Sequence, residues 1–250
     1  MAAWNRWCVT VAQEGRGRLH PVAHLCLRDA AWLDAQLDVL ARAGVRLAMI
    51  APALVDGRPL SHPDHDRLWA SFCHHGVTPV FHVAEQPRPF ADAWYTDDGA
   101  AFVPVLGAVF IHVAAALACT DLILNGTLER FPDLRIGIVE LSAIWVPMYL
   151  MMLDGAVAFT RQINGRDPVP LSLQPSDYFR RQVRVSSFAY EAPASIQQQL
   201  GGADLLMCCS DYPHAEGTAT PVADYAAGGV RVDGAPGLFH DNVAFLLRRS

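Results

Sequence analysis

The sequence contains no lysine, because all 19 basic residues of the 250-residue chain are arginine. This absence excludes a phosphate-binding Walker loop, a pyridoxal-phosphate Schiff base and a lysine-dependent aldolase, each of which needs the lysine amine. It also excludes a two-metal site bridged by a carboxylated lysine. An arginine-favouring genome is the plainer origin of the absence, but the chemical exclusions hold in either case.

Charge is also scarce. Charged residues make up 18% of the chain and hydrophobic residues 52%, a balance that excludes an extensively disordered protein. The net charge is −6, whereas a nucleic-acid-binding protein normally presents a basic face. We therefore expect no nucleic-acid partner.

Long apolar runs and paired cysteines are missing too. No run reaches the roughly 20 residues that a membrane span needs, and residues Ala2–Trp7 lack the basic flank and apolar stretch of a signal peptide. The six cysteines show no zinc-type C-x-x-C spacing. These features predict a cytoplasmic protein with reduced thiols and no membrane association.

Short apolar runs alternate along the chain with longer amphipathic ones, which is typical of a parallel sheet covered by helices. The strands are predicted at Leu19–Leu25, Val45–Ile50, Thr78–Val83, Arg135–Glu140, Val183–Phe188 and Leu205–Cys209. The helices are predicted at Ala30–Ala43, Pro63–His74, Leu106–Leu124, Ile144–Phe159, Ser176–Arg181, Ser195–Leu200, Pro221–Ala227 and Asp241–Arg249. No linker or repeat divides the sequence, so we expect residues 1–250 to form a single domain.

Two common α/β architectures lack their signatures in this sequence. No glycine-rich turn follows the first predicted strand, as a nucleotide-binding doubly wound sheet requires. No G-x-S-x-G segment is present, as an α/β-hydrolase requires. A (β/α) barrel fits better, although six strands are predicted and eight are needed.

Three predicted strands finish in residues that can bind a metal or move a proton: His82, Glu140 and Asp211. In a parallel barrel the chemistry collects where strands end and their following loops begin. Imidazole and carboxylate groups meeting at one barrel mouth suit Zn²⁺ or Mn²⁺. A single histidine at the end of an apolar strand is more often a core residue, so the prediction rests on all three together.

The segment Gly126–Glu140, followed by Ala143–Pro147, Pro175–Phe179 and Ser210–His214, resembles the amidohydrolase-related family. That family includes aminocarboxymuconate-semialdehyde decarboxylase and related aromatic-acid decarboxylases and hydrolases. The resemblance implies a (β/α)8 TIM-barrel fold and a metal-dependent hydrolase or non-oxidative decarboxylase. The implied substrate is a small cyclic or aromatic carboxylate, and the implied metal is Zn²⁺, with Mn²⁺ as the alternative.

The same resemblance implies roles for the three strand-end residues. His82 matches a metal-ligating histidine of the family, and Asp211 matches the aspartate that ligates the metal or orients its water, which makes it both a metal and a catalytic residue. Glu140 stands where many members have a histidine used in acid-base chemistry. A carboxylate there can accept a proton or bind metal, but it cannot act as a cationic acid near pH 7.

The sequence departs from the family pattern at its start. Family members open with a strand carrying H-x-H or E-x-H, which supplies two of the four usual ligands, and this sequence begins after the position of that strand. His20 and His24 are no substitute, because their i, i+4 spacing places them about 13 Å apart along a strand. We therefore expect an incomplete barrel with unpaired strand edges and weak metal binding. The alternative is that the residues before Arg18 or the C-terminal helix cover the gap.

This departure leaves a second function open: a catalytically weakened barrel that serves as a binding or assembly subunit. A homo-oligomer is compatible with either function. Three further residues are predicted to contact the substrate, namely His112, Trp145 and His214. Each also has a purely structural interpretation, as a helix-start residue, a core residue and a loop residue respectively.

Replacing Asp211 tests the predicted site directly. We expect Asp211→Ala to abolish any activity while leaving the fold intact, because the residue follows a strand on the face where barrels place chemistry rather than packing. Turnover and the circular-dichroism spectrum are measured side by side. Full turnover with an unchanged spectrum would contradict the assignment.

Overall fold

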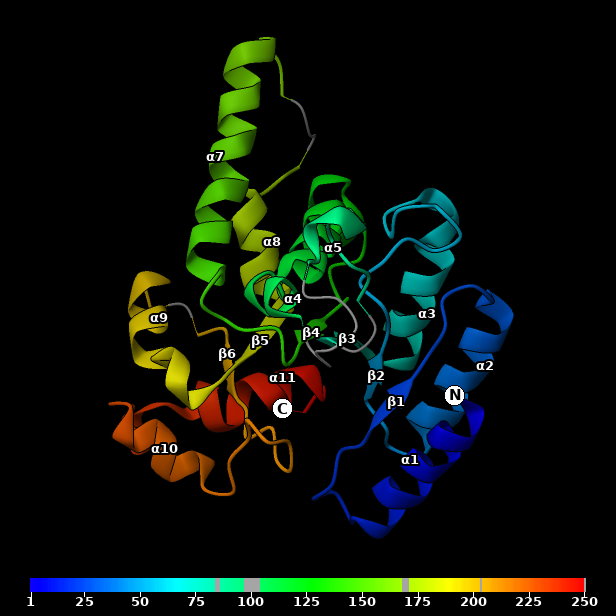
Figure 1. Ribbon diagram of the computed structural model, residues 1–250. Helices are drawn as coiled ribbons and strands as arrows, with labels where there is room; N and C mark the ends of the chain where they lie inside the picture. The colour runs from blue at the N-terminus through cyan, green and yellow to red at the C-terminus, as the bar shows by residue number, and fades with distance from the viewer. Residues whose placement is uncertain (84–85, 97–103, 168–170, 203, 250) are drawn as a thin grey trace.

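The computed structural model describes residues 1–83, 86–96, 104–167, 171–202 and 204–249, and these contain one sheet of six parallel strands in chain order (Figure 1). The strands are β1 (Val22–His24), β2 (Leu47–Met49), β3 (Thr78–Phe81), β4 (Ile136–Ile138), β5 (Val183–Ser187) and β6 (Leu206–Cys208). All six predicted strands are present. They are shorter than predicted because neighbouring strands pair over only two or three residues.

The helices follow the predicted order. They are α1 (Ala2–Glu14), α2 (Ala30–Arg42), α3 (Asp66–His75), α4 (Val105–Val109), α5 (Val113–Leu124), α6 (Thr127–Arg130), α7 (Val146–Asn164), α8 (Pro175–Gln182), α9 (Pro193–Gln199), α10 (Pro221–Ala227) and α11 (Asn242–Leu246). Single turns lie at η1 (Pro63–His65), η3 (Asp92–Trp94), η4 (Ala189–Glu191), η5 (Val232–Gly234) and η6 (Gly237–Asp241).

One predicted helix is in fact two. The predicted helix Leu106–Leu124 is interrupted by a turn at residues 110–112, which separates α4 from α5. Every residue from Val105 to Ile111 is apolar or glycine, so no change of polarity marks the break. The turn brings His112 to the start of α5.

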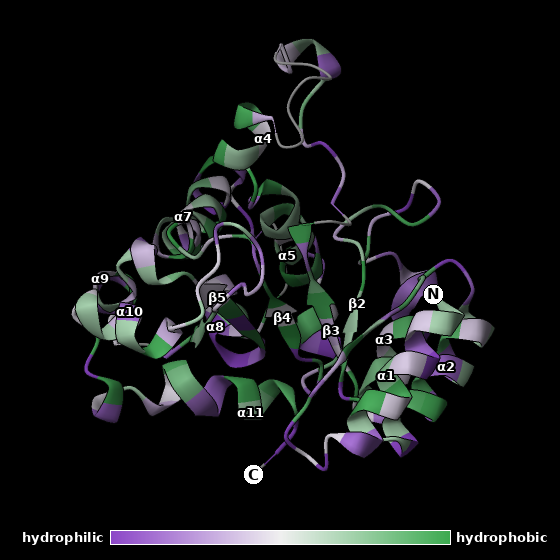
Figure 2. Cartoon of the chain, turned by 60° about the horizontal axis from the view of Figure 1, so that its bottom comes forward, coloured by the Kyte–Doolittle hydropathy of each residue, from purple (hydrophilic) through white to green (hydrophobic). Residues whose placement is uncertain are grey.

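The helices bury one face of the sheet. In α2 the buried residues Leu33, Leu37 and Leu40 recur at helical spacing, and Asp29 caps the helix by accepting hydrogen bonds from two backbone N–H groups of its first turn. Figure 2 shows strands β3 and β4 as hydrophobic, with α5 beside them and α11 nearby. A Cβ atom added to Gly137 in β4 would lie 3.1 Å from Leu246, so the glycine allows the close approach of α11.

The sequence analysis missed α1, which covers the outer edge of β1. Asn5 accepts a hydrogen bond from the His24 N–H (2.9 Å) and donates one to the His24 carbonyl oxygen (3.1 Å). The Trp4 Nε1–H donates to the Val22 carbonyl oxygen at 3.0 Å. The side chain of a buried asparagine thus makes the two bonds that a neighbouring strand would make.

The outer edge of β6 is hydrogen-bonded in a similar way. Asn242, at the start of α11, donates to the Leu206 carbonyl oxygen of β6 at 2.8 Å. Asn5 and Asn242 are 3% and 4% exposed, so both replace water at the sheet edge. As expected of an incomplete barrel, β1 and β6 do not pair with each other in the described sheet. Side chains from α1 and α11 bond the backbone groups at these edges, which agrees with the alternative that those segments cover the gap. Among the described residues no helix has both the length and the apolar character of a membrane span.

The edge bonds of Asn5 generate a stability prediction. Asn5→Ala removes the side-chain partner of the part-buried backbone N–H and carbonyl of His24, at about 1–3 kcal/mol each, so the free energy of unfolding falls by about 2–6 kcal/mol. Chemical denaturation measures this loss, and size-exclusion chromatography detects self-association through the exposed edge. Asn164→Ala, at the exposed end of α7, is the matched control. Equal stability of the two variants would contradict the edge-pairing role of Asn5.

Candidate active site

Parallel strands bring their carboxyl ends to one rim of the sheet, and the three strand-end residues lie there. His82 follows β3, Glu140 follows β4 and Asp211 follows β6. His82 Nε2 lies 2.5 Å from Glu140 Oε2, a short charge-assisted contact. Both side chains are mostly buried, with 26% and 16% of their surfaces exposed.

The backbone at the two carboxylates is in an unusual conformation. Glu140 has φ 57° and Asp211 has φ 53°, in the left-handed region that costs a side chain-bearing residue about 1–2 kcal/mol. The surrounding structure holds both: the Glu140 N–H donates to Ser186 Oγ at 3.0 Å, and the Asp211 carbonyl accepts from the His214 N–H at 2.9 Å. A Cβ atom on Gly217 would lie 2.3 Å from the Asp211 carbonyl oxygen, so the loop closes only with glycine there. Strain of this kind is concentrated at functional sites.

Two residues of the last loop complete an acidic cluster. His214 Nδ1 lies 3.2 Å from Asp211 Oδ1 and 3.6 Å from Glu140 Oε1. Glu216 also contributes a ligand-type oxygen, and the donor atoms of these four residues lie within 4.8 Å of one another. His214, predicted as a substrate contact, therefore lies among the carboxylates. Glu216 follows Asp211 in the same loop, a position that suits either a role beside the site or simple loop structure.

The pKa values of the Glu140 and Asp211 carboxylates are shifted in opposite directions. The hydrogen bond with His82 lowers the pKa of Glu140 below its ordinary value, although burial opposes the shift. Burial raises the pKa of Asp211, and the negative charge of Glu140 raises it further. Glu140 is therefore the stable anion of the pair, and the charge on Asp211 is disfavoured in the metal-free protein.

The cluster fits a divalent cation. Asp211 Oδ2 is fully buried and has no hydrogen-bond partner among the described residues, an arrangement that a bound cation satisfies. Imidazole nitrogens and carboxylate oxygens form the donor set, which suits Mn²⁺ or Zn²⁺. Glu140, Asp211, His214 and Glu216 are thus grouped closely enough to hold a metal, and His82 Nε2 contacts Glu140 beside them.

A cavity of about 620 Å³ opens beside Glu140 and Glu216. Two aromatic pairs line it: His112 stacks on Trp145 with ring centroids 5.5 Å apart, and Phe188 stacks on Tyr190 at 5.1 Å. Burial lowers the pKa of His112, so this ring favours the neutral form. Two predicted substrate contacts, His112 and Trp145, are therefore in the cavity wall.

Sequence reasoning missed the buried Glu191, which joins two rim loops. Its carboxylate accepts hydrogen bonds from the Ala143 N–H at 3.2 Å and from the Phe188 N–H at 3.0 Å. These bonds fix the loop after β4 to the loop after β5, and so set the position of the aromatic wall. The contact spans 48 residues of sequence, and no local pattern marks it.

Asp211→Asn is expected to stabilise the metal-free protein. Because the folded-state pKa of Asp211 is raised, the stability linked to its protonation is present below the ordinary aspartate pKa of 3.8 and is lost as the pH rises through the folded value. The Asp211→Asn variant does not suffer that loss of stability. Its melting temperature therefore exceeds that of the wild type at pH 7–8, and the difference vanishes toward pH 4. Thermal melts in chelator test this. A variant that melts lower than the wild type at pH 8 would contradict it.

No protein-family model matches the chain, and no curated protein sequence matches it. Solved structures do match. An amidohydrolase from Mycobacterium avium subsp. paratuberculosis K-10 superposes with a TM-score of 0.73 at 23% identity, over 98% of this chain and 63% of that one. The chain thus spans less than two thirds of the length of that structure.

Two aromatic-acid decarboxylases are similar as well. The 5-carboxyvanillate decarboxylase of Novosphingobium aromaticivorans, complexed with manganese and 4-hydroxy-3-methoxy-5-nitrobenzoic acid, has a TM-score of 0.79 at 20% identity, over 99% of this chain and 69% of that one. A 2,6-dihydroxybenzoate decarboxylase from Rhizobium has a TM-score of 0.75 at 17% identity, over 98% and 76%. The chain has the α/β, TIM-barrel-type fold of these amidohydrolases and decarboxylases.

Proposed function

We propose that the protein is a metal-dependent hydrolase or non-oxidative decarboxylase of small aromatic or cyclic carboxylates. The observation that carries the proposal is the junction of an aromatic-walled cavity with an acidic, histidine-containing cluster. Flat rings stack favourably on aromatic side chains. The cavity volume lies within the range typical of small-molecule sites.

The charges around the cavity make a cation necessary for such a substrate. Glu140, Glu191 and Glu216 line the cavity, and its described wall includes no arginine. A substrate carboxylate entering this space meets like charges, which repel it strongly in a partly buried site. When bound, a divalent cation neutralises that carboxylate and polarises it as a Lewis acid.

The protein's own residues supply the remaining chemistry. The hydrogen bond with His82 favours the ionised form of Glu140, so Glu140 Oε2 is able to accept a proton from a water molecule and give it to the reacting atom of the substrate. Stacked His112 and Trp145 orient the ring and exclude water from the cavity.

The solved structures support the general kind of reaction. Manganese is bound in the 5-carboxyvanillate decarboxylase structure, and 2,6-dihydroxybenzoate is bound in a 2,6-dihydroxybenzoate decarboxylase structure. We extend the substrate class, and Mn²⁺ or Zn²⁺ as cofactor, to this chain on the strength of its own cluster and cavity. No observation in the described residues favours the alternative assembly subunit.

The proposal is tested with protein loaded with Mn²⁺ or Zn²⁺ and incubated with hydroxybenzoates and cyclic carboxylates, following CO₂ release and product masses. We expect turnover that is abolished when a chelator removes the metal. In the Glu140→Gln variant we expect kcat to fall by about 10²–10⁴-fold, because the proton acceptor is gone. CO₂ release identifies decarboxylation, and product mass identifies hydrolysis.

Glu14→Gln, an exposed change at the end of α1, is the matched control and should leave kcat unchanged. Metal bound at one ion per chain without turnover of any substrate would contradict the proposal. Equal kcat values for Glu140→Gln and the wild type would contradict the role of Glu140.

A further inference from the structure

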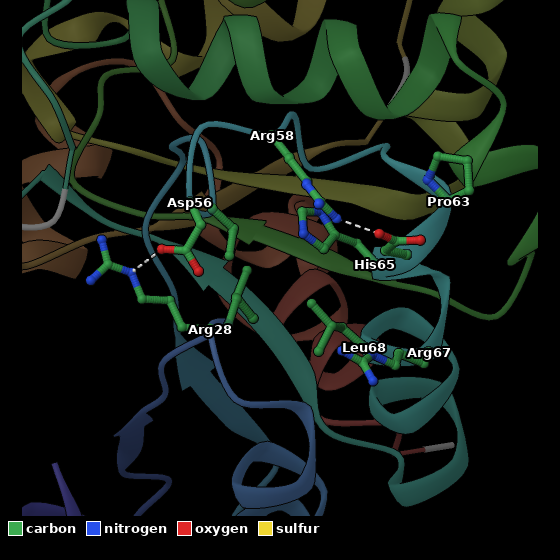
Figure 3. Close-up of a pocket in the computed structure, with 10 residues that line it drawn as sticks. Arg28, Asp56, Arg58, Pro63, His65, Arg67 and Leu68 are labelled. Carbon is green, nitrogen blue, oxygen red and sulfur yellow. Dashed lines mark hydrogen bonds and ion pairs between the residues drawn. The ribbon is translucent and has the colours of Figure 1, made fainter.

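A second cavity, of about 570 Å³, lies apart from the candidate active site and shares no lining residue with it. It is bordered by the loop after β1, a turn after β2 and the first turn of α3 (Figure 3). Three arginines line it: Arg28, Arg58 and Arg67. Figure 3 shows Arg28 and Arg67 on opposite sides, with Arg58 between them.

The turn after β2 is a rigid wall of this cavity. Val55 and Arg58 exchange backbone hydrogen bonds of 2.9 and 3.0 Å across Asp56 and Gly57. Both central residues have positive φ, 49° and 78°, the geometry that an Asp-Gly pair favours in a two-residue hairpin turn. The positions of Asp56 and Arg58 are therefore set by the backbone.

His65 provides a buried polar group at the cavity, since it is 7% exposed and lines the wall. Its Nδ1 lies 2.9 Å from the Pro59 carbonyl oxygen. Because a carbonyl only accepts, Nδ1 carries a proton and donates it to Pro59. The nearly buried side chains of Leu27 and Leu68 add apolar wall.

The arginines are available to a ligand. Arg28 pairs with Asp56 at 3.0 Å, and Arg58 pairs with Asp64, but all four side chains are more than half exposed, so both pairs are weak. Arg67 makes no ion pair or hydrogen bond with any described residue. Three cations against two anions leave the cavity with a net charge of +1, on a protein whose net charge is −6.

We propose that this cavity binds a phosphate monoester of a small organic molecule. Guanidinium groups on three sides match the three terminal oxygens of a phosphate, whereas a carboxylate offers only two. The cavity is much larger than a phosphate ion, and its apolar wall accommodates an organic body.

Isothermal titration calorimetry with phenyl phosphate tests the proposal on the wild type and on Arg67→Gln and Arg58→Gln. Each loss of a charge-assisted contact is expected to weaken binding at least tenfold, on the order expected for hydrogen bonds to charged groups. Added NaCl weakens wild-type binding, because the exposed arginines are screened. Inorganic phosphate should bind more weakly than phenyl phosphate, since it leaves the apolar wall uncovered.

Two control variants separate this cavity from general charge effects and from the candidate active site. Arg42→Gln removes an exposed arginine from α2, and Asp211→Asn alters only the acidic cluster. Both should bind phenyl phosphate within about twofold of the wild type. Absence of binding, or equal affinity in all five proteins, would overturn the proposal. Tighter binding of benzoate that Arg67→Gln abolishes would overturn the phosphate assignment in favour of a carboxylate.

Discussion

Side-chain hydrogen bonds to the sheet's two outer strands hold the strand ends, and with them the site residues, in place. Strands that pair over two or three residues cannot hold a rim by themselves. A buried asparagine completes the backbone bonding of β1, and another contributes to that of β6. Because the outer strands are fixed, the carboxyl ends of all six strands stay on one rim, where the site residues lie.

Local sequence pattern predicts the strands and most helices of this fold, since burial and helical spacing are properties of short segments. It does not predict α1, because the reason for that helix lies in Asn5 bonding to His24, nineteen residues away. It also missed Glu191, whose partner Ala143 is 48 residues distant. In both cases a polar side chain hydrogen-bonds a backbone group that is distant in the sequence and lies beside it only in the folded protein.

Part of the candidate site was predictable, because functional residues of parallel barrels lie at the carboxyl ends of the strands. His82, Glu140 and Asp211 were singled out from their positions, and they lie together on the rim. The opposed pKa shifts of the two carboxylates depend on burial and distance, which sequence does not contain. This cluster lowers the stability of the metal-free protein, because a buried Asp211 oxygen has no hydrogen-bond partner among the described residues. A loss of stability of this kind is common at ligand-binding and catalytic sites.

We propose that the rim holds a divalent cation between His82 and Asp211, beside Glu140. Crystals grown with Mn²⁺ and measured at the manganese absorption edge test it most directly. We predict one strong anomalous peak within bonding distance of His82 Nε2 and of an Asp211 carboxylate oxygen. A peak elsewhere, or no peak with His82 still bonded to Glu140, would contradict it.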